Sequence, residues 1–128
     1  MTNKLAILLK ETDEIEVINV PTKNKGLQFY YQNINCDMIT IVKAMYLGNK
    51  YSLVTDYEGL LKAEPKVNML ASILYGYLQH GQYLVGNVLV MKDEFTDEGL
   101  DTVGLDKAEA AVIVNILNDL KKKYKIIN

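Results

Sequence analysis

The fold of this chain is decided by two runs, Met38-Ile-Thr-Ile-Val-Lys-Ala-Met45 and Lys50-Tyr-Ser-Leu-Val-Thr55. Both are rich in β-branched and apolar residues, a composition that is typical of strands. Gly48 and Asn49 stand between them and can adopt the positive φ angles of a tight turn. The sequence therefore predicts an antiparallel hairpin, which closes at Asp56-Tyr-Glu-Gly59.

Two further strands are predicted ahead of this hairpin. Leu5 to Leu9 is a continuous apolar run, as in a strand that is buried on both faces. Ile15 to Val20 follows the polar turn Glu11-Thr-Asp-Glu14 and ends at Pro21, which offers no N–H group to a strand ladder. We therefore expect these two strands to form a second hairpin.

The run from Tyr83 to Met91 is predicted to be the central strand of the sheet. Apolar residues dominate it, and Gly86 indicates a bulge or a close backbone approach. The segment that follows, Asp93 to Gly104, is acidic and contains two glycines. It is predicted to be a loop.

Two short helical segments are predicted between the strands. Thr22 can cap a helix that runs to about Gln32, although Gly26 weakens this prediction. Asn68 to Gln79 has apolar residues at a helical period, but Gly76 interrupts it. This second segment predicts a short helix or a partly irregular crossover.

A long amphipathic helix is predicted at the end of the sequence. Asp106 and Glu109 have the spacing of a capping box, which places the start of the helix there. One apolar stripe follows at helical spacing: Ala110, Ile113, Val114, Leu117, Leu120 and Tyr124. Ala111, Val112 and Ile116 widen the stripe beyond what one sheet face would cover. The surplus suggests a second subunit, as in a homodimer or a higher homo-oligomer.

Together these elements predict an α+β fold. We expect a mainly antiparallel sheet with short helices, and the long C-terminal amphipathic helix packed on one face. A length of 128 residues fits a single domain that spans residues 1–128.

Composition limits the compartment and the partners. No apolar stretch approaches the roughly 20 residues that span a bilayer, and the first residues lack the flanks of a signal peptide. We therefore expect a cytoplasmic protein that binds no membrane. Its 14 basic residues are all lysine and its net charge is −2, so phosphate and guanine lack an arginine clamp and duplex DNA is not an expected partner.

The residues available for catalysis favour a protein that is not an enzyme. His80 is the only histidine and Cys36 the only cysteine, which leaves no histidine pair or cysteine cluster for a metal. The glycines Gly76, Gly81 and Gly86 match neither dinucleotide nor P-loop spacing. We therefore expect no catalytic residues, no metal and no cofactor.

Tyrosine is the more suggestive signal, with nine copies and no tryptophan. Its flat ring and single hydroxyl suit both protein interfaces and stacking against a base, although most tyrosines in a small protein complete the edges of its core. Amide side chains that could read an adenine-like ring lie near two of the tyrosines in sequence, and lysines could supply charge for phosphates. The candidate ligand-binding residues are Lys66, Asn68, Tyr75, His80, Tyr83 and Asn87.

The order of motifs resembles the domain-of-unknown-function family number thirty-eight forty-six. The resemblance covers roughly residues 5–116, and is carried by the Met38–Thr55 hairpin, the Asp56-Tyr-Glu-Gly59 turn, Pro65-x-x-Asn68 and the strand Gly86-Asn-Val-Leu-Val-Met91. Family members commonly carry arginine just after the asparagine, where this chain has Met69. The resemblance implies a small protein of phages or mobile elements in low-GC Gram-positive bacteria, and it supplies no catalytic residues.

Two functions follow from the tyrosines and the resemblance. The first is a non-catalytic phage or prophage anti-defence protein that binds and sequesters a nucleotide immune signal, such as a cyclic ADP-ribose or a cyclic oligonucleotide. The alternative is a protein-interaction module that inhibits a host protein. A polar cavity at a dimer seam favours the first function, and a flat exposed apolar patch with no deep pocket favours the second.

Overall fold

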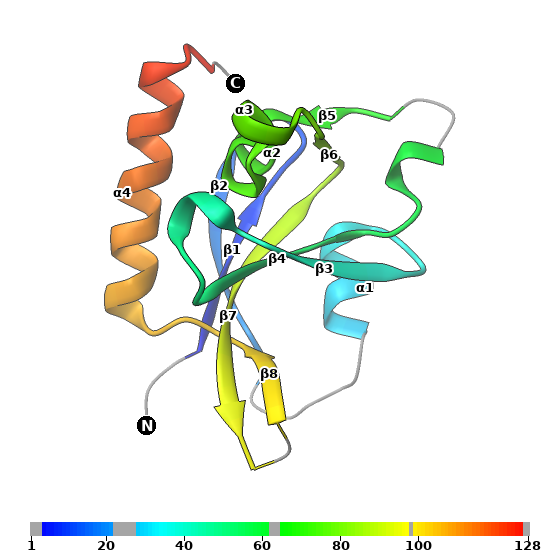
Figure 1. Cartoon of the computed structure of the whole chain (residues 1–128). Coiled ribbons are helices and arrows are strands. Elements are labelled where there is room, and N and C mark those ends of the chain that lie inside the picture. Colours follow the sequence, from blue (N-terminus) through cyan, green and yellow to red (C-terminus); the bar gives the residue numbers. More distant parts are fainter. Residues whose placement is uncertain (1–3, 22–27, 62–64, 98, 127–128) are drawn as a thin grey trace.

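A computed structural model of the chain describes residues 4–21, 28–61, 65–97 and 99–126. In these ranges the larger sheet has the strand order β2-β1-β7-β4-β3, with β8 beside β7, and β5 pairs with β6 separately (Figure 1). Every strand pair is antiparallel. The strands are β1 Leu5–Leu9, β2 Ile15–Asn19, β3 Ile39–Lys43, β4 Tyr51–Asp56, β5 Val67–Asn68, β6 Leu84–Val85, β7 Val88–Thr96 and β8 Gly99–Val103.

Helices cover both faces of the larger sheet. They are α1 Gln28–Ile34, α2 Met69–Tyr75, α3 Tyr77–His80 and α4 Lys107–Lys123, with the 3₁₀ turns η1 Met45–Leu47 and η2 Gly59–Leu61. On one face, α2 and α4 pack against the inward residues of the strands, among them Ile7, Leu53 and Val90. On the other face, α1 packs against Leu8 and Leu89. The predicted α+β fold is confirmed, and α1 adds a helix on the face opposite α4 (Figure 1).

Both predicted hairpins are present. β1 pairs with β2, and β3 pairs with β4 in the register Ile41 opposite Val54. The predicted strand end at Met45 is wrong, because residues 45–47 form the turn η1 and Gly48 continues the connection with a φ of 101°. The cap predicted at Thr22 lies outside the described residues, and α1 ends at Ile34 rather than at Gln32.

The central strand lies where it was predicted but has different ends. β7 pairs with β1 on one side and β4 on the other, so that Val90 lies between Ile7 and Leu53. It begins at Val88, because Gly86 has a φ of 74° and separates it from β6. The left-handed φ at this glycine turns one predicted strand into two.

The acidic segment after the central strand is a hairpin rather than the predicted loop. β7 continues to Thr96, and β8 pairs with it in the register Asp93 opposite Thr102. Charged side chains such as Glu94 and Asp101 fit here because they are exposed at the surface of the hairpin. Gly99, with a φ of 110°, lies at the turn.

The capping box predicted for the long helix is confirmed. The N–H group of Glu109 donates to the Asp106 carboxylate over 2.7 Å, and the N–H group of Asp106 donates to the Glu109 carboxylate over 3.1 Å. Ala110, Ile113, Leu117 and Leu120 are buried against the sheet and α2. Of the predicted surplus, Ile116 packs against this core, whereas the side chain of Val112 is 58% exposed.

Glu109 also connects α4 to the sheet. Its carboxylate accepts a hydrogen bond from the Tyr51 hydroxyl over 3.1 Å and pairs with the Lys92 ammonium at 3.1 Å. Burial favours a higher pKa for Glu109, but the hydrogen bonds from the Asp106 backbone, Lys92 and Tyr51 outweigh it and hold its pKa below the ordinary value of 4.5. The folded state therefore favours the ionised carboxylate.

We expect Glu109→Gln to lower the free energy of unfolding by about 1 kcal/mol at neutral pH, through the loss of charge-assisted hydrogen bonds. A carboxyl group whose pKa is lowered by folding stabilises the fold above its unfolded pKa, and this contribution disappears as the pH falls through the folded pKa. Urea denaturation at pH 7 and pH 3 should therefore show the difference between Glu109→Gln and wild type shrink at the lower pH. An equal difference at both pH values would contradict the role given to Glu109.

None of the helices described in the structure combines the length and the apolar character that a membrane span requires.

Candidate functional site

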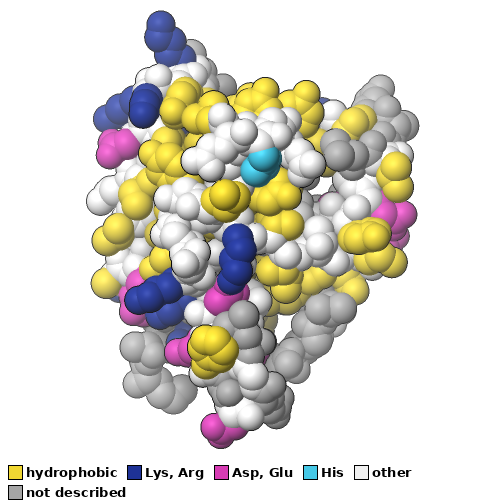
Figure 2. Space-filling view, in the orientation of Figure 1, with side chains coloured by type: hydrophobic (Ala, Val, Ile, Leu, Met, Phe, Trp, Pro, Cys, Tyr) yellow, Lys and Arg dark blue, Asp and Glu magenta, His cyan; other side chains and the backbone are white. Residues whose placement is uncertain are grey.

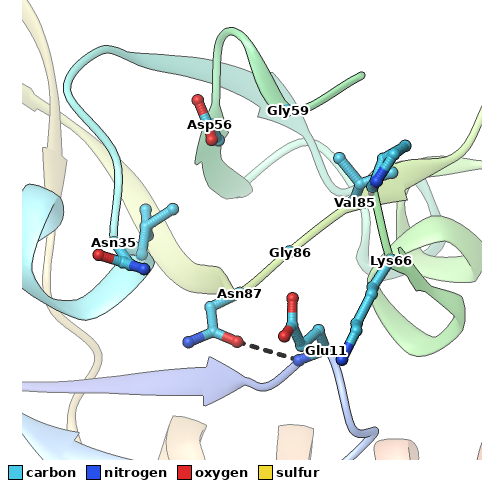
Figure 3. Close-up of a pocket in the computed structure, with 10 residues that line it drawn as sticks. Glu11, Asn35, Asp56, Gly59, Lys66, Val85, Gly86 and Asn87 are labelled. Carbon is cyan, nitrogen blue, oxygen red and sulfur yellow. Dashed lines mark hydrogen bonds between the residues drawn. The ribbon is translucent and has the colours of Figure 1, made fainter. Parts of the chain in front are cut away.

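A cavity of about 110 Å³ lies where several elements end (Figure 3). Glu11 comes from the turn between β1 and β2, Asn35 follows α1, and Asp56 ends β4. Lys66 precedes β5, and Asn87 precedes β7. The cavity therefore joins polar side chains that are far apart in the sequence.

Gly86 places open backbone in the lining of this cavity. Its N–H group donates to the Lys66 carbonyl over 2.9 Å, and its carbonyl accepts from the Asn68 amide over 2.8 Å. A Cβ atom built on Gly86 would meet nothing within 4 Å. The main chain here is thus fixed by hydrogen bonds while the space beside its Cα stays open, which suits close approach of a ligand.

Asn87 holds the elements around the cavity together. Its side-chain oxygen accepts from the Glu11 N–H group over 3.0 Å (Figure 3), and its side-chain nitrogen donates to the Asn33 carbonyl over 3.2 Å. A primary amide can accept two hydrogen bonds and donate two. Each end of Asn87 therefore retains the capacity for one further bond, which a ligand could use.

A second, wider hollow of about 350 Å³ adjoins the cavity. The two share Asn35 and Asp56 in their linings, and the wider hollow adds Cys36, Asp37 and Glu58. Its carboxylates give it negative charge, whereas in the smaller cavity Lys66 brings one positive charge beside the carboxylates of Glu11 and Asp56. Phosphate would be repelled from the wider hollow and attracted toward Lys66.

Asn68 belongs to the folded core rather than to the cavity. It is fully buried, and its side-chain nitrogen donates to the carbonyl groups of Leu9 and Gly86 over 2.9 and 2.8 Å. Its side-chain oxygen caps α2 by accepting from the Ala71 N–H group over 3.1 Å. Its polar atoms thus join β1, α2 and the Gly86 segment, and do not face a ligand.

Three of the other predicted residues gather around α3. The rings of Tyr75 and His80 meet edge to face at 4.6 Å, and those of Tyr77 and Tyr83 stack at 5.3 Å. His80 Nδ1 accepts from the Gln82 N–H group over 3.1 Å, so Nε2 carries the proton and donates to the Tyr75 carbonyl over 3.1 Å. Both nitrogens of His80 are therefore used to close this turn.

The six predicted site residues divide into three groups. Lys66 and Asn87 line the cavity, Asn68 is buried beside it, and the remaining three lie around α3. Sequence reasoning missed Glu11, Asn35 and Asp56, whose segments were interpreted as turns or left unassigned. Their polar side chains at turns gave no signal that the fold brings them together.

An exposed apolar surface surrounds α3. We call it the α3 surface; its exposed members are Met45, Leu78 and Tyr83. Met45 and His80 both lie close to Gly76, since a Cβ atom on that glycine would be 3.1 Å from the sulfur of one and the Nε2 atom of the other. Figure 2 shows hydrophobic side chains near His80 on this face, among uncharged polar and backbone atoms.

Comparison of the chain with protein-family models, with curated proteins and with solved structures finds no match. The family resemblance seen in the sequence stays a prediction, and no residue role is transferred from another protein. The candidate site is therefore defined by its own geometry.

Proposed function

We propose that this chain is a non-catalytic binding protein that sequesters a small nucleotide, with the nucleoside end in the cavity between Lys66, Gly86 and Asn87. The observation that carries this proposal is the convergence of an amide, carboxylates and an ammonium group around open glycine backbone. Such a set of groups suits a ligand with hydroxyl groups, a polar ring and negative charge.

The size of the cavity supports entry by one part of the ligand. Small-molecule sites usually measure roughly 300 to 1,000 Å³, and this cavity measures about 110 Å³. Glu11 and Asp56 supply carboxylates, the group that commonly accepts hydrogen bonds from ribose hydroxyls. A ribose with part of its base is therefore the fragment that we place here, and the rest of the ligand extends outside.

Charge determines where the phosphates lie. The wider hollow is lined by Asp37, Asp56 and Glu58, so a phosphate there would face carboxylates. Lys66 lines the opposite part of the site and is exposed, so its ammonium group can reach a phosphate at the mouth of the cavity. The absence of arginine limits this contact to a point charge without a bidentate clamp.

We expect Lys66→Ala to weaken binding of a nucleoside mono- or diphosphate about tenfold and to leave binding of the parent nucleoside unchanged. Lys122→Ala is the matched control, because it removes the same charge from an exposed position on α4. Isothermal titration with adenosine, AMP and ADP checks the difference. Equal loss for nucleoside and nucleotide, or equal effects of the two variants, would count against the proposed phosphate position.

The biological setting is proposed from the family resemblance. A phage or prophage protein that sequesters a nucleotide immune signal in the host cytoplasm would protect the phage without catalysing a reaction. Support for sequestration over catalysis comes from His80, whose two ring nitrogens are both bound to local backbone atoms. A base for catalysis would need one nitrogen to face a substrate.

A second candidate is a module that binds and inhibits a host protein. The α3 surface favours it, because exposed methionine, leucine and tyrosine side chains are typical of protein interfaces. Leu78→Glu separates the two functions, since it adds charge to the α3 surface and lies outside the cavity lining. Loss of anti-defence activity with intact nucleotide binding would favour the protein partner.

A further inference from the structure

The outer edge of β3 presents backbone groups that no described strand pairs with. β3 has β4 as its one neighbour among the described strands. At its two ends, Tyr57 N–H donates to the Met38 carbonyl over 2.9 Å and Ala44 N–H donates to the Tyr51 carbonyl over 3.1 Å. Backbone groups alternate in direction along an antiparallel strand, so those of residues 38, 40, 42 and 44 face β4. The N–H and C=O groups of Ile39, Ile41 and Lys43 therefore point outward.

This edge lacks the features that usually keep an edge strand from pairing. β3 contains no proline, and its register with β4 runs without a bulge from Ile39 to Lys43. The charge of Lys43 is paired with the carboxylate of Asp93, whose side chain is 8% exposed. Ile41, in the middle of the strand, is 47% exposed. The edge therefore combines open hydrogen-bonding groups with an apolar side chain and no unpaired charge.

We infer that β3 is the contact between two copies of this chain, which join their sheets by antiparallel β3–β3 pairing. The two-fold axis passes between the Ile41 residues of the two copies, and Ile39 of each copy lies opposite Lys43 of the other. These are the residues with outward-facing groups, so each pair exchanges both of its N–H···O=C bonds. The result is one continuous sheet with an isologous interface.

Self-complementarity favours a second copy as the occupant. The outward-facing residues are spaced evenly about Ile41, so an identical strand in the reverse direction matches them completely. Thr40 of one copy then lies opposite Val42 of the other, which is a favourable pair of β-branched residues. Lys43 lies at opposite ends of the two strands, so the two like charges stay far apart. Asp37 lies just beyond the end that receives Lys43 of the other copy, and their charges are opposite.

The β2 edge of the sheet is less suited to the same contact. At the two ends of β2, the Val20 N–H group donates to the Lys4 carbonyl and the Glu14 carbonyl accepts from the Lys10 N–H group. Residues 14, 16, 18 and 20 therefore face β1, and the backbone groups of residues 15, 17 and 19 point outward. A symmetric β2–β2 pair would put the two Glu16 carboxylates at diagonal positions on one face, where like charges repel. The Lys10–Glu16 ion pair is too exposed to offset this strongly.

Ile41→Lys tests the inference, because it places two like charges directly across the two-fold axis. Val17→Lys is the matched control on β2, where the replaced side chain is 46% exposed, and Val112→Lys is the control on α4. We expect native mass spectrometry and sedimentation equilibrium to give a dimer for wild type and both controls. Ile41→Lys should raise the dimer dissociation constant at least a hundredfold.

A monomeric wild type would overturn the inference, as would a dimer that only Val17→Lys or Val112→Lys dissociates. Ile41→Pro is a second variant, since it removes an outward N–H group and leaves the ladder to β4 intact. Both Ile41 variants should keep the amides of Thr40 and Val42 protected from hydrogen exchange, which shows that the β3–β4 hairpin is folded. The amides of Ile39 and Lys43 should be protected in wild type and exchange rapidly in the variants. Rapid exchange of these two amides in a wild-type dimer would place the interface elsewhere.

Discussion

Replacing Asn68 by alanine is expected to lower the free energy of unfolding by about 3 kcal/mol. The change removes the cap of α2, which is worth about 1 kcal/mol. It also removes the hydrogen bonds that Asn68 donates to the buried Leu9 carbonyl and to the part-buried Gly86 carbonyl, at a cost of about 1 kcal/mol for each. Equilibrium urea denaturation followed by circular dichroism measures the change.

Two variants separate the parts of this effect. Asn68→Asp keeps an acceptor for the Ala71 N–H group but cannot donate to either carbonyl, so it should lose nearly as much stability as Asn68→Ala. Asn118→Ala, at an exposed position on α4, should change stability by less than about 0.5 kcal/mol. A loss at Asn68 as small as that at Asn118 would contradict the role assigned to its side chain.

The second large effect is expected at Gly59, whose α-carbon lies close to the side chain of Val85. A Cβ atom at this position would collide with Cγ2 of Val85, a buried side chain in β6. Val85 has a single side-chain torsion and cannot move aside without disturbing its neighbours. We therefore expect Gly59→Ala to lower the free energy of unfolding by about 2 kcal/mol, as is usual for an overpacked site.

A double-mutant cycle tests the stated cause. Val85→Ala alone should be destabilising because it leaves a cavity, but in its presence Gly59→Ala should cost little, since the clashing methyl group is gone. Gly59 does not have a positive φ angle, so an alanine there adds no backbone strain that would complicate the comparison. Additive effects of the two changes would show that another contact limits position 59.

Local signals in the sequence predict most of the fold correctly. Asp106 and Glu109 are close in the chain and define a helix start through their own backbone and side chains, so the capping box could be predicted directly. The hairpins are similarly local, because Gly48 and the turn after Leu9 stand between paired apolar runs. Each of these features depends on residues within a few positions of one another.

The errors arise where distant contacts decide the structure. The segment from Asp93 to Gly104 was predicted to be a loop because it is acidic. It forms an exposed hairpin instead, in which charged side chains stay in water and carry no desolvation cost. Gly86 was expected to mark a bulge or a close backbone approach within one strand. It separates two strands instead, because β6 pairs with β5 while β7 pairs with β1 and β4.

The candidate site was only partly visible in the sequence. Lys66 and Asn87 were selected for their chemistry and lie in the cavity, together with Glu11 and Asp56 from other hairpins. Tyr75 and Tyr83 were selected because they are near these residues in sequence, yet they lie around α3 outside the cavity lining. Nearness in sequence does not predict where these side chains lie, because the chain changes direction at Gly76 between α2 and α3.

The most direct test of nucleotide sequestration is mass spectrometry of the small molecules that heat releases from the purified protein. The protein is first incubated in lysate from cells whose defence systems produce nucleotide signals, with Lys66→Ala treated in parallel. Our account predicts an intact nucleotide released from the wild type and much less from the variant. Protein that carries no nucleotide, or that releases a converted one, would contradict sequestration.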